Sequence, residues 1–323
     1  MSEELFLRVV NHYGSKGTPF LFLIDFEMEH FIATKLKDTS KTGIFYDIKG
    51  NTNFNYTAIE KDISIKNLQP ISKTKYRQAF EIVHNNILLG NSYLLNLTFP
   101  TEIDLSCSLK SVFNSSKAPY KLLYKNQFTL FSPECFIRIV GREIFSYPMK
   151  GTIDANLPNA QDILLDSEKE LNEHNTIVDL IRNDLSIVAK KVEVTKFRFI
   201  DKIIAQNHQL YQASSEIKGL LPENWKKNIG NILLNLLPAG SISGAPKKKT
   251  IEIIQNAEKQ KRGFYTGIFG IFDGKELDSA VNIRFIENKN GKTIYRSGGG
   301  ITAQSNLDSE YNELIQKVYV PVN

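Results

Sequence analysis

Glu134 and Lys150 are the two side chains whose local sequence most directly indicates acid–base or nucleophilic chemistry. Glu134 stands between two phenylalanines, and a carboxyl group in apolar surroundings can keep its proton and act as a general acid. Lys150 lies between a methionine and a glycine after an apolar strand, where burial would lower the pKa of the amine and make it a nucleophile. Each residue alone also fits an ordinary, partly exposed position.

Carboxylates on two expected helices form a second candidate group. In the last helix, expected over Asp308–Val318, the residues Glu310, Glu313 and Lys317 stand at i, i+3 and i+7 and share one face. This ridge could line a cleft, or it could be a solvated face with a Glu313–Lys317 pair. Glu173, on a long amphipathic helix, alone fits one more solvated glutamate.

Two glycine-rich segments could bring backbone N–H groups close to an anion. Gly298-Gly299-Gly300 follows an expected strand, and consecutive glycines let a ligand approach the backbone. Pro238–Lys247 enters a helix, with Pro246 expected at the first helical position, and a helix N-terminus suits an anion. The first segment lacks the helix of a dinucleotide-binding motif, and the second lacks the Gly-Lys-Ser/Thr of a Walker loop.

The elements that must position these residues come in irregular runs of strands and helices, which favours an α+β fold over a doubly wound parallel sheet. A capping box beginning at Ser167 predicts the start of the long helix that carries Glu173, and His174 on its apolar stripe is expected in the core. Strands are expected at Leu5–Val10, Pro19–Phe26, Gly43–Ile48, Ser92–Phe99, Val192–Phe199, Phe264–Phe272, Ser279–Glu287 and Lys292–Ser297. Further helices are expected at Lys73–Leu89, Trp225–Leu237 and Pro246–Glu258.

Composition excludes several classes of protein. The 323 residues carry a formal charge of +5 and are 41% hydrophobic, values typical of a globular protein and too weakly basic for a dedicated nucleic-acid domain. Two cysteines, Cys107 and Cys135, cannot build a disulfide framework, and no apolar stretch approaches the length of a membrane span. No signal peptide is recognisable, so we expect a cytoplasmic protein.

Taken together and in this order, the motifs resemble the chorismate-utilising enzymes, which include anthranilate, aminodeoxychorismate, isochorismate and salicylate synthases. The motifs are Ser132-Pro133-Glu134, Pro148–Thr152, Glu173–Asp184, Gly240–Lys247, Arg262–Gly267, Ile283-Arg284 and Gly298–Lys317. The resemblance covers roughly residues 73–320, and it implies a catalytic region over 73–323 behind a shortened, strand-rich segment over 1–72. It also implies two large, mainly antiparallel sheets packed face to face, with helices outside.

The resemblance further implies a role for each candidate residue. Glu173 and Glu313, with Glu310 nearby, would hold Mg²⁺, an ion that prefers oxygen ligands and retains water. Glu134 would protonate the C4 hydroxyl of chorismate as it leaves. The substrate would be bound by Thr152, Ser243, Tyr265, Arg284, Gly298, Gly299, Gly300 and Lys317.

Lys150 points to one branch of the family. Aminodeoxychorismate synthases typically carry lysine here and use it as a covalent nucleophile, whereas anthranilate synthases, the alternative, typically carry alanine. Water-using members carry a lysine in the strand that matches Ser92–Phe99, which has none here, and many members carry His where Gln212 stands. Related synthases usually have Gln where Leu94 stands, a departure with no evident consequence.

The chain's possible partners follow from the same resemblance. No glutaminase signature is present, so a separate glutamine amidotransferase subunit is expected to supply ammonia. The short N-terminal segment predicts no tryptophan regulation. A competing, non-enzyme interpretation is an anion- or nucleic-acid-binding module built on Lys247–Lys249, which would leave the ordered carboxylates unexplained.

Overall fold

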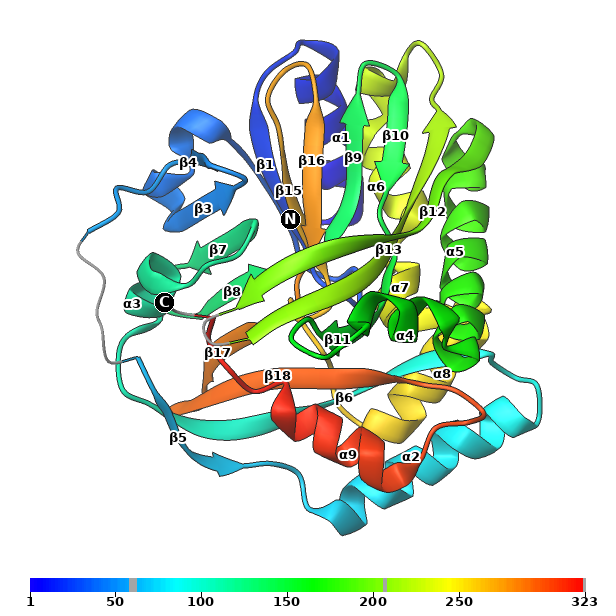
Figure 1. The fold of residues 1–323 in the computed structure, drawn as a ribbon. Coiled ribbons are helices and arrows are strands. Elements are labelled where there is room, and N and C mark those ends of the chain that lie inside the picture. Colours follow the sequence, from blue (N-terminus) through cyan, green and yellow to red (C-terminus); the bar gives the residue numbers. More distant parts are fainter. Residues whose placement is uncertain (58–62, 206–207, 322–323) are drawn as a thin grey trace.

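Two large antiparallel sheets form the framework of the computed structural model, which describes residues 1–57, 63–205 and 208–321 (Figure 1). In order across the first sheet lie β11 (Met149–Asp154), β13 (His208–Leu220), β10 (Glu143–Ser146), β9 (Cys135–Val140), β16 (Leu277–Val281), β15 (Ile268–Phe272), β1 (Phe20–Ile24) and β2 (Phe31–Lys35), with β12 (Lys190–Ala205) beside β13. In order across the second lie β14 (Gly244–Ala245), β6 (Leu94–Leu105), β18 (Lys292–Ile301), β17 (Phe285–Lys289), β8 (Phe128–Ser132), β7 (Tyr120–Tyr124), β3 (Ile44–Ile48) and β4 (Asn51–Thr52), with β5 (Ile65–Gln69) beside β6.

The two sheets pack through a shared apolar core. One buried cluster joins Leu21 and Phe269 of the first sheet to Tyr46, Leu122 and Leu130 of the second. Burial of alternate strand residues on the facing sides removes apolar surface from water and holds the layers together. The α+β sandwich expected from the sequence is therefore confirmed.

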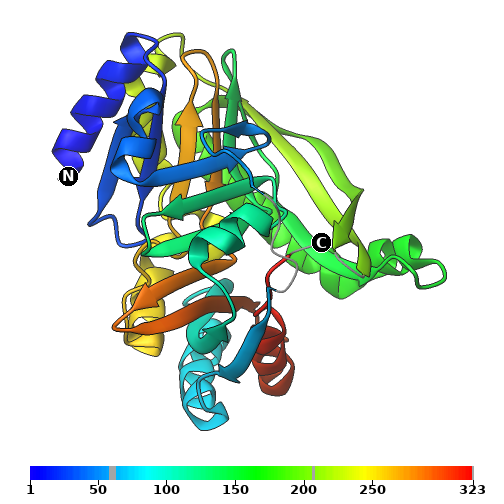
Figure 2. The same cartoon turned by 90° about the vertical axis from the view of Figure 1, so that its left-hand side faces the viewer.

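Helices cover the outer faces of the sandwich. They are α1 (Glu3–Ser15), η1 (Leu36–Asp38), η2 (Ser40–Thr42), α2 (Lys73–Leu88), α3 (Leu109–Ser115), α4 (Ala160–Asp166), α5 (Glu168–Val188), η3 (Trp225–Asn228), α6 (Ile229–Leu236), α7 (Gly240–Ser243), α8 (Lys247–Glu258) and α9 (Leu307–Gln316). In Figure 2 the long β12–β13 hairpin and α4 lie at the right edge of the molecule. No helix within the described residues has the length and apolarity needed to cross a bilayer.

The expected helix cap and core histidine on α5 are both confirmed. The hydroxyl of Ser167 accepts a hydrogen bond from the backbone N–H of Glu170 at 3.3 Å, which satisfies one of the free donors of the first turn. His174 is fully buried, and its Nε2 lies 2.7 Å from Oγ of Ser215. Burial lowers the pKa of His174 to about 4.

The expected strand at Leu5–Val10 is wrong, because this segment belongs to α1. Its buried residues, Phe6, Val10 and Gly14, recur every fourth position, which puts them on one helical face. The helix packs closely on η3, where a Cβ atom at position 14 would come within 2.0 Å of the carbonyl oxygen of Lys226. The run of apolar residues hid this periodicity.

Three smaller expectations near the candidate site also need correction. The triple glycine lies within β18, not after it, because Gly298 to Gly300 pair with Thr98 to Asn96 of β6. The strand expected over Ser279–Glu287 is two strands, β16 and β17, joined by residues that cross between the sheets. Pro246 precedes α8 as its N-cap and is not its first residue.

Residues 1–72 contribute strands to both sheets. In the first sheet, β1 lies between β15 and β2, and in the second sheet β3 pairs with β7 and β5 with β6. The N-terminal segment is thus built into the same two layers that carry the candidate site residues.

Candidate active site

Glu134 lies in the short connection between β8 and β9, where its side chain meets the glycine-rich loop. The hydroxyl of Ser241 in α7 donates a hydrogen bond to Oε1 of Glu134. Burial raises the pKa of the Glu134 carboxyl, while this hydrogen bond and the positive charges of Arg284, Lys150 and Lys317 act in the opposite direction. The net shift is upward, which suits a group that must deliver a proton.

Lys150 reaches the same region from β11. Its Nζ lies 3.4 Å from Oε2 of Glu173 on α5, and both side chains are largely covered. Lys150 also fills the space beside Gly300 in β18, because a Cβ atom built on Gly300 would lie 3.2 Å from Nζ of Lys150 and 3.2 Å from Cδ1 of Leu94. A glycine at position 300 therefore leaves the room that the amine needs.

A bulge next to Lys150 turns the strand locally. The pairing of β11 with β13 shifts between Lys150 and Thr152, and Gly151 between them has a φ of +78°, in the left-handed region that favours glycine. Gln212 pairs with Thr152 in this register, so the position where many family members carry histidine borders the Lys150 strand. The side chain of Thr152 lies outside the described part of the structure.

α9 presents its carboxylates to the glycine run of β18. A Cβ atom on Gly299 would stand 3.2 Å from Oε2 of Glu310 and 3.5 Å from Oε1 of Glu313. The hydroxyl of Ser305 donates to Oε1 of Glu310 at 2.7 Å and fixes that carboxylate. The helical spacing thus brings both glutamates to one point on the strand, as the i, i+3 pattern predicts.

Lys317 at the end of α9 closes this side of the site. Its Nζ donates to the carbonyl oxygen of Gly298 at 2.9 Å and lies 2.5 Å from Oε1 of Glu313. Burial lowers the pKa of the Lys317 amine, against the opposing effect of Glu313. The expected Glu313–Lys317 pair therefore exists, and it lies against the glycine run.

Arg284 and Tyr265 lie where the chain passes between the two sheets. Arg284 has a φ of +52°, a strained value for a residue with a side chain, and such strain persists where the surrounding structure enforces it. Tyr265 is buried, and burial raises the pKa of its hydroxyl to about 12. Arg284 influences the electrostatics of the site, since its charge acts on Glu134 and on Lys317.

A buried ion pair holds the glycine-rich loop in place. Arg262 and Glu258 are both 1% exposed and lie 2.6 Å apart. Arg262 also donates to the carbonyl oxygen of Ile242 at 3.0 Å, while Oε1 of Glu258 accepts from the backbone N–H of Thr98 at 2.8 Å. Ser243, whose hydroxyl donates to the carbonyl oxygen of Ala239 at 2.8 Å, is fully buried in this loop.

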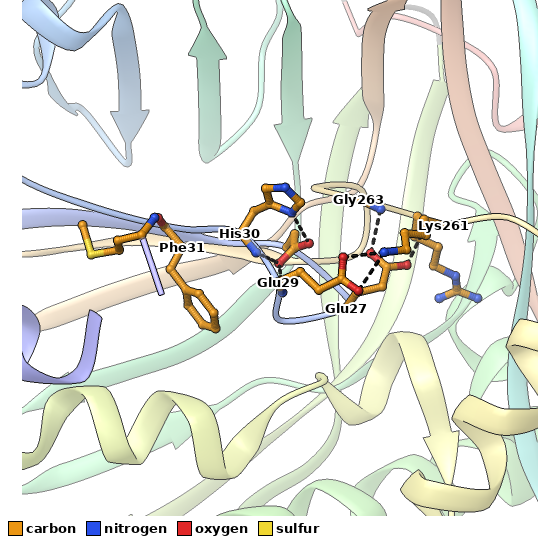
Figure 3. Close-up of polar contacts among 9 residues, drawn as sticks. Glu27, Glu29, His30, Phe31, Lys261 and Gly263 are labelled. Carbon is orange, nitrogen blue, oxygen red and sulfur yellow. Dashed lines mark hydrogen bonds and ion pairs between the residues drawn. The ribbon is translucent and has the colours of Figure 1, made fainter. Parts of the chain in front are cut away.

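The turn between β1 and β2 fixes the segment that leads to Tyr265 (Figure 3). The Glu27 carboxylate accepts hydrogen bonds from the backbone N–H groups of Arg262 at 2.8 Å and Gly263 at 2.9 Å. Glu29 binds Nζ of Lys261 at 2.7 Å. The N-terminal strands thereby support the loop on which the buried ion pair depends.

The lysine patch Lys247–Lys249 is partly neutralised within the protein. Nζ of Lys247 lies 2.9 Å from Oδ2 of Asp184 and donates to the carbonyl oxygen of Leu236 at 2.7 Å. Lys249 pairs with Glu252 at 3.1 Å. Two of the three lysines are thus engaged within the protein, which weakens the basis of the non-enzyme interpretation.

Cys135 lies beside the site but is unsuited to act as a nucleophile. Cys135 forms no disulfide. Cys135 follows Glu134 directly, but burial and the nearby charge of Asp278 raise the pKa of its thiol to about 12, so it stays protonated at neutral pH.

The donor set around Gly299 fits a hard divalent cation. Among the described residues no group of three or more His, Cys, Asp or Glu side chains is placed so that it could hold a metal ion. The carboxylates of Glu310 and Glu313 nevertheless converge on the space left by the missing side chain of Gly299. Oxygen donors with room for water are what Mg²⁺ accepts, since it keeps several waters and takes few protein ligands.

Sequence reasoning brought most of these residues forward and missed three. Glu134, Lys150, Arg284 and Lys317 form one electrostatic group in the structure, with Glu173 beside Lys150. The missed residues are Ser241, Ser305 and Tyr319. Each contacts a residue that the sequence did predict, namely Glu134, Glu310 and Arg284 in turn. A lone hydroxyl in a loop has no periodicity, so only its place inside a recognised motif could have marked Ser241.

Comparisons with known proteins place this geometry in context. A family model described as chorismate binding enzyme matches residues 9–323. An uncharacterized PabA-like protein of Pasteurella multocida is 54% identical over 100% of both chains. Aminodeoxychorismate synthase component 1 of Escherichia coli is 33% identical over 76% of this chain and 55% of that protein, so the chain spans about half the length of that relative. In fold, the menaquinone-specific isochorismate synthase of Escherichia coli matches 97% of this chain and 80% of its own, with a TM-score of 0.73 and 15% identity.

Proposed function

This chain belongs to the chorismate-binding enzyme family, and on that premise we propose that it aminates chorismate at C4 to give 4-amino-4-deoxychorismate. The activity would be that of an aminodeoxychorismate synthase component I, which serves p-aminobenzoate and folate synthesis. A relative with this activity at 33% identity supports the proposal. The reaction replaces the C4 hydroxyl by an amino group and keeps the enolpyruvyl ether.

The position of Lys150 is the observation that carries the proposal. Its Nζ lies beside Glu173 and against the backbone of Gly300, and its charge acts on Glu134. An amine in this position can reach a ring held between Glu134 and β18. Covalent catalysis by a lysine splits one difficult substitution into two easier steps.

In the first step, the Lys150 amine, after losing its ammonium proton to solvent, would form a bond to C2 of the ring. The ring double bond shifts, the C4–O bond breaks, and Glu134 gives its proton to the departing oxygen, so that water leaves. The raised pKa of Glu134 keeps a proton available for this transfer. The new secondary ammonium then loses a proton, which returns to Glu134 and restores the acid.

In the second step, ammonia would add at C4. The double bond shifts back and the C2–N bond to Lys150 breaks. The lysine nitrogen leaves with the proton that the newly added ammonium group gives up. The sum is chorismate plus ammonia giving aminodeoxychorismate plus water. Lys150 is regenerated in this balance, which is what a catalytic nucleophile requires.

Substrate binding would use the positive groups and the glycine run. Arg284 and Lys317 can hold carboxylate groups, and β18 offers a surface without side chains along Gly298–Gly300. Glu310 and Glu313, which meet at Gly299, would hold Mg²⁺ together with Glu173, the third ligand that the resemblance implies. When bound, the ion would neutralise and orient the ring carboxylate.

Ammonia would come from a separate glutamine amidotransferase subunit. The sequence has two cysteines, and the Cys135 thiol, with its pKa raised to about 12, is unsuited to act as a glutaminase nucleophile. Added ammonium salts would replace such a subunit in an assay, so the synthase chemistry can be tested on this chain alone.

The test is to incubate the protein with chorismate, Mg²⁺ and ammonium and to identify the product by mass. We expect aminodeoxychorismate. Anthranilate with release of pyruvate would contradict the proposal and assign amination at C2, and isochorismate would assign water as the nucleophile. A Ser186→Ala variant, altered on an exposed face of α5, is the matched control for protein handling.

A further inference from the structure

Tyr319 follows α9 on a segment that is anchored on both sides. The hydroxyl of Tyr295 donates to the carbonyl oxygen of Tyr319 at 2.9 Å. Val318 and Val320 are buried in the cluster on the outer face of the second sheet, while Tyr319, between them, is 40% exposed. Because its two neighbours are buried, the backbone at position 319 is fixed, and the Tyr319 side chain points to the side opposite the valine side chains.

The side chain of Tyr319 lies on Arg284. Nε of Arg284 donates to the Tyr319 hydroxyl at 3.3 Å, and the guanidinium carbon lies 5.3 Å from the centre of the ring. A guanidinium at this distance from an aromatic ring is attracted to it, and the hydrogen bond adds direction to the contact. The side chain of Arg284 is therefore held at one edge by the ring and the hydroxyl together.

This contact uses Nε and leaves the two terminal nitrogens of the Arg284 guanidinium, its fork, available to a ligand. Among the described residues Arg284 forms no ion pair, whereas Arg262 and Arg296 are each bound by a glutamate. The terminal nitrogens of a guanidinium match the two oxygens of a carboxylate, and the fit depends on the orientation of the plane. A contact at Nε alone fixes that plane and leaves the fork to a ligand.

The backbone of Arg284 points to the same conclusion. Its left-handed φ of +52° occurs where the chain crosses from β16 to β17, and its carbonyl oxygen accepts from the N–H of Phe131 at 3.2 Å. Main chain and side chain are thus both constrained, although the guanidinium has no carboxylate partner in the described structure. Constraint of this kind lowers the entropy that a ligand must remove on binding.

We propose that Tyr319 is a positioning residue that orients Arg284 to bind a carboxylate of the substrate. The inference rests on the proposed function, because it concerns the same site and the same dianionic substrate. Tyr319 touches Arg284, which would touch the ligand. Its loss should therefore weaken substrate binding and leave the chemical step nearly unchanged.

The experiment compares Tyr319→Phe and Tyr319→Ala with the wild type, in chorismate affinity by calorimetry and in KM and kcat for amination. Alanine removes both the ring and the hydroxyl, and we expect a Kd and KM about tenfold higher with kcat within about twofold. Phenylalanine keeps the ring, so we expect a rise of only about twofold. Tyr93→Ala, at a tyrosine that is 66% exposed, is the matched control.

A double-mutant cycle separates positioning from a general structural effect. With Arg284→Lys as background, Tyr319→Ala should cause little further loss of affinity, because the group that it orients is gone. The inference would be overturned if the affinity losses of the two substitutions added up in the double mutant. It would also be overturned if Tyr319→Ala left the Kd unchanged, or if it lowered kcat at constant KM. Melting temperatures show whether Tyr319→Ala folds. If it does not, the same cycle is run with Tyr319→Phe, alone and combined with Arg284→Lys, and the chorismate affinities of these variants are compared.

The two proposals fail in different ways. If the wild type binds chorismate but yields a product other than aminodeoxychorismate, the proposed function is wrong and the affinity series still decides the role of Tyr319. If the wild type does not bind chorismate, both are wrong. If the wild type makes aminodeoxychorismate and the Tyr319 variants bind chorismate as tightly as it does, only the role of Tyr319 is wrong.

Discussion

The hydroxyl of Ser241 donates a hydrogen bond to Oε1 of Glu134, which joins the glycine-rich loop to the connection between β8 and β9. The bond has an electrostatic consequence, because a donor aimed at a carboxylate favours its charged form. Burial of Glu134 has the opposite and larger effect, so the pKa of the carboxyl lies above its usual value. Ser241 thus limits how far burial raises the pKa of the proposed general acid.

Replacing Ser241 with alanine should shift the pH profile of the reaction. A general acid must be protonated, so the rate falls as pH rises through its pKa. Without the Ser241 donor the pKa of Glu134 rises further, and we expect the alkaline limb of kcat/KM to move to higher pH. A downward shift or an unchanged limb would show that the hydroxyl does not act on the titrating group.

Alanine substitutions at Gly299 and Gly300 should produce different defects. A Cβ atom at 299 meets the Glu310 and Glu313 carboxylates, so we expect about tenfold weaker activation by Mg²⁺. A Cβ atom at 300 meets Nζ of Lys150, so we expect a lower kcat with little change in the Mg²⁺ requirement. Titrations of activity against Mg²⁺ distinguish the two variants. Identical titration profiles would contradict the prediction that position 299 affects Mg²⁺ binding and position 300 affects Lys150.

Replacing Glu258 with glutamine should destabilise the protein strongly. The change leaves the guanidinium of Arg262 buried without its counter-charge, and breaking a buried pair in this way typically costs about 3–5 kcal/mol. Urea unfolding measures the difference in free energy of unfolding. Glu252→Gln, in an exposed pair with Lys249, is the control and should change stability by less than about 1 kcal/mol. Equal effects of the two variants would contradict the structural role of the buried pair.

The buried Lys121 should make stability depend on pH. Burial lowers the pKa of its amine to about 8, below the usual value of 10.5, so between these values the unfolded chain binds more protons than the folded one. Stability contributed by this residue therefore rises with pH, by about 2 kcal/mol from pH 8 to 9.5. Lys121→Met should lack this rise in chemical unfolding measured across that range. A parallel pH dependence in both proteins would show that Lys121 does not titrate there.

Periodicity and motif order predicted much of the framework. The α5 helix, its Ser167 cap and the buried His174 follow from a regular apolar stripe, and the spacing of Glu310 and Glu313 correctly predicts that they share a face. The α1 helix was missed because its apolar residues run together in sequence and become a stripe only in the helix that packs on η3.

Features that depend on tertiary contact could not be predicted. The glycine run continues as a strand because β6 offers it a pairing partner, which a local pattern does not reveal. The left-handed backbone of Arg284 results from the crossing between the sheets, and the Tyr319 contact joins two segments that are separate in the sequence. Ser241 is adjacent to Glu134 only after both loops are in place.

The central claim is that Lys150 forms a covalent bond to the ring, and intact-protein mass spectrometry tests it most directly. The protein is mixed with chorismate and Mg²⁺ without ammonium, quenched and weighed, and the modified peptide is mapped. We predict a mass increase equal to chorismate less one water, located at Lys150 and absent from Lys150→Ala, whose amination rate at C4 should also fall by several orders of magnitude. No adduct on the wild type, together with undiminished amination by Lys150→Ala, would contradict the account.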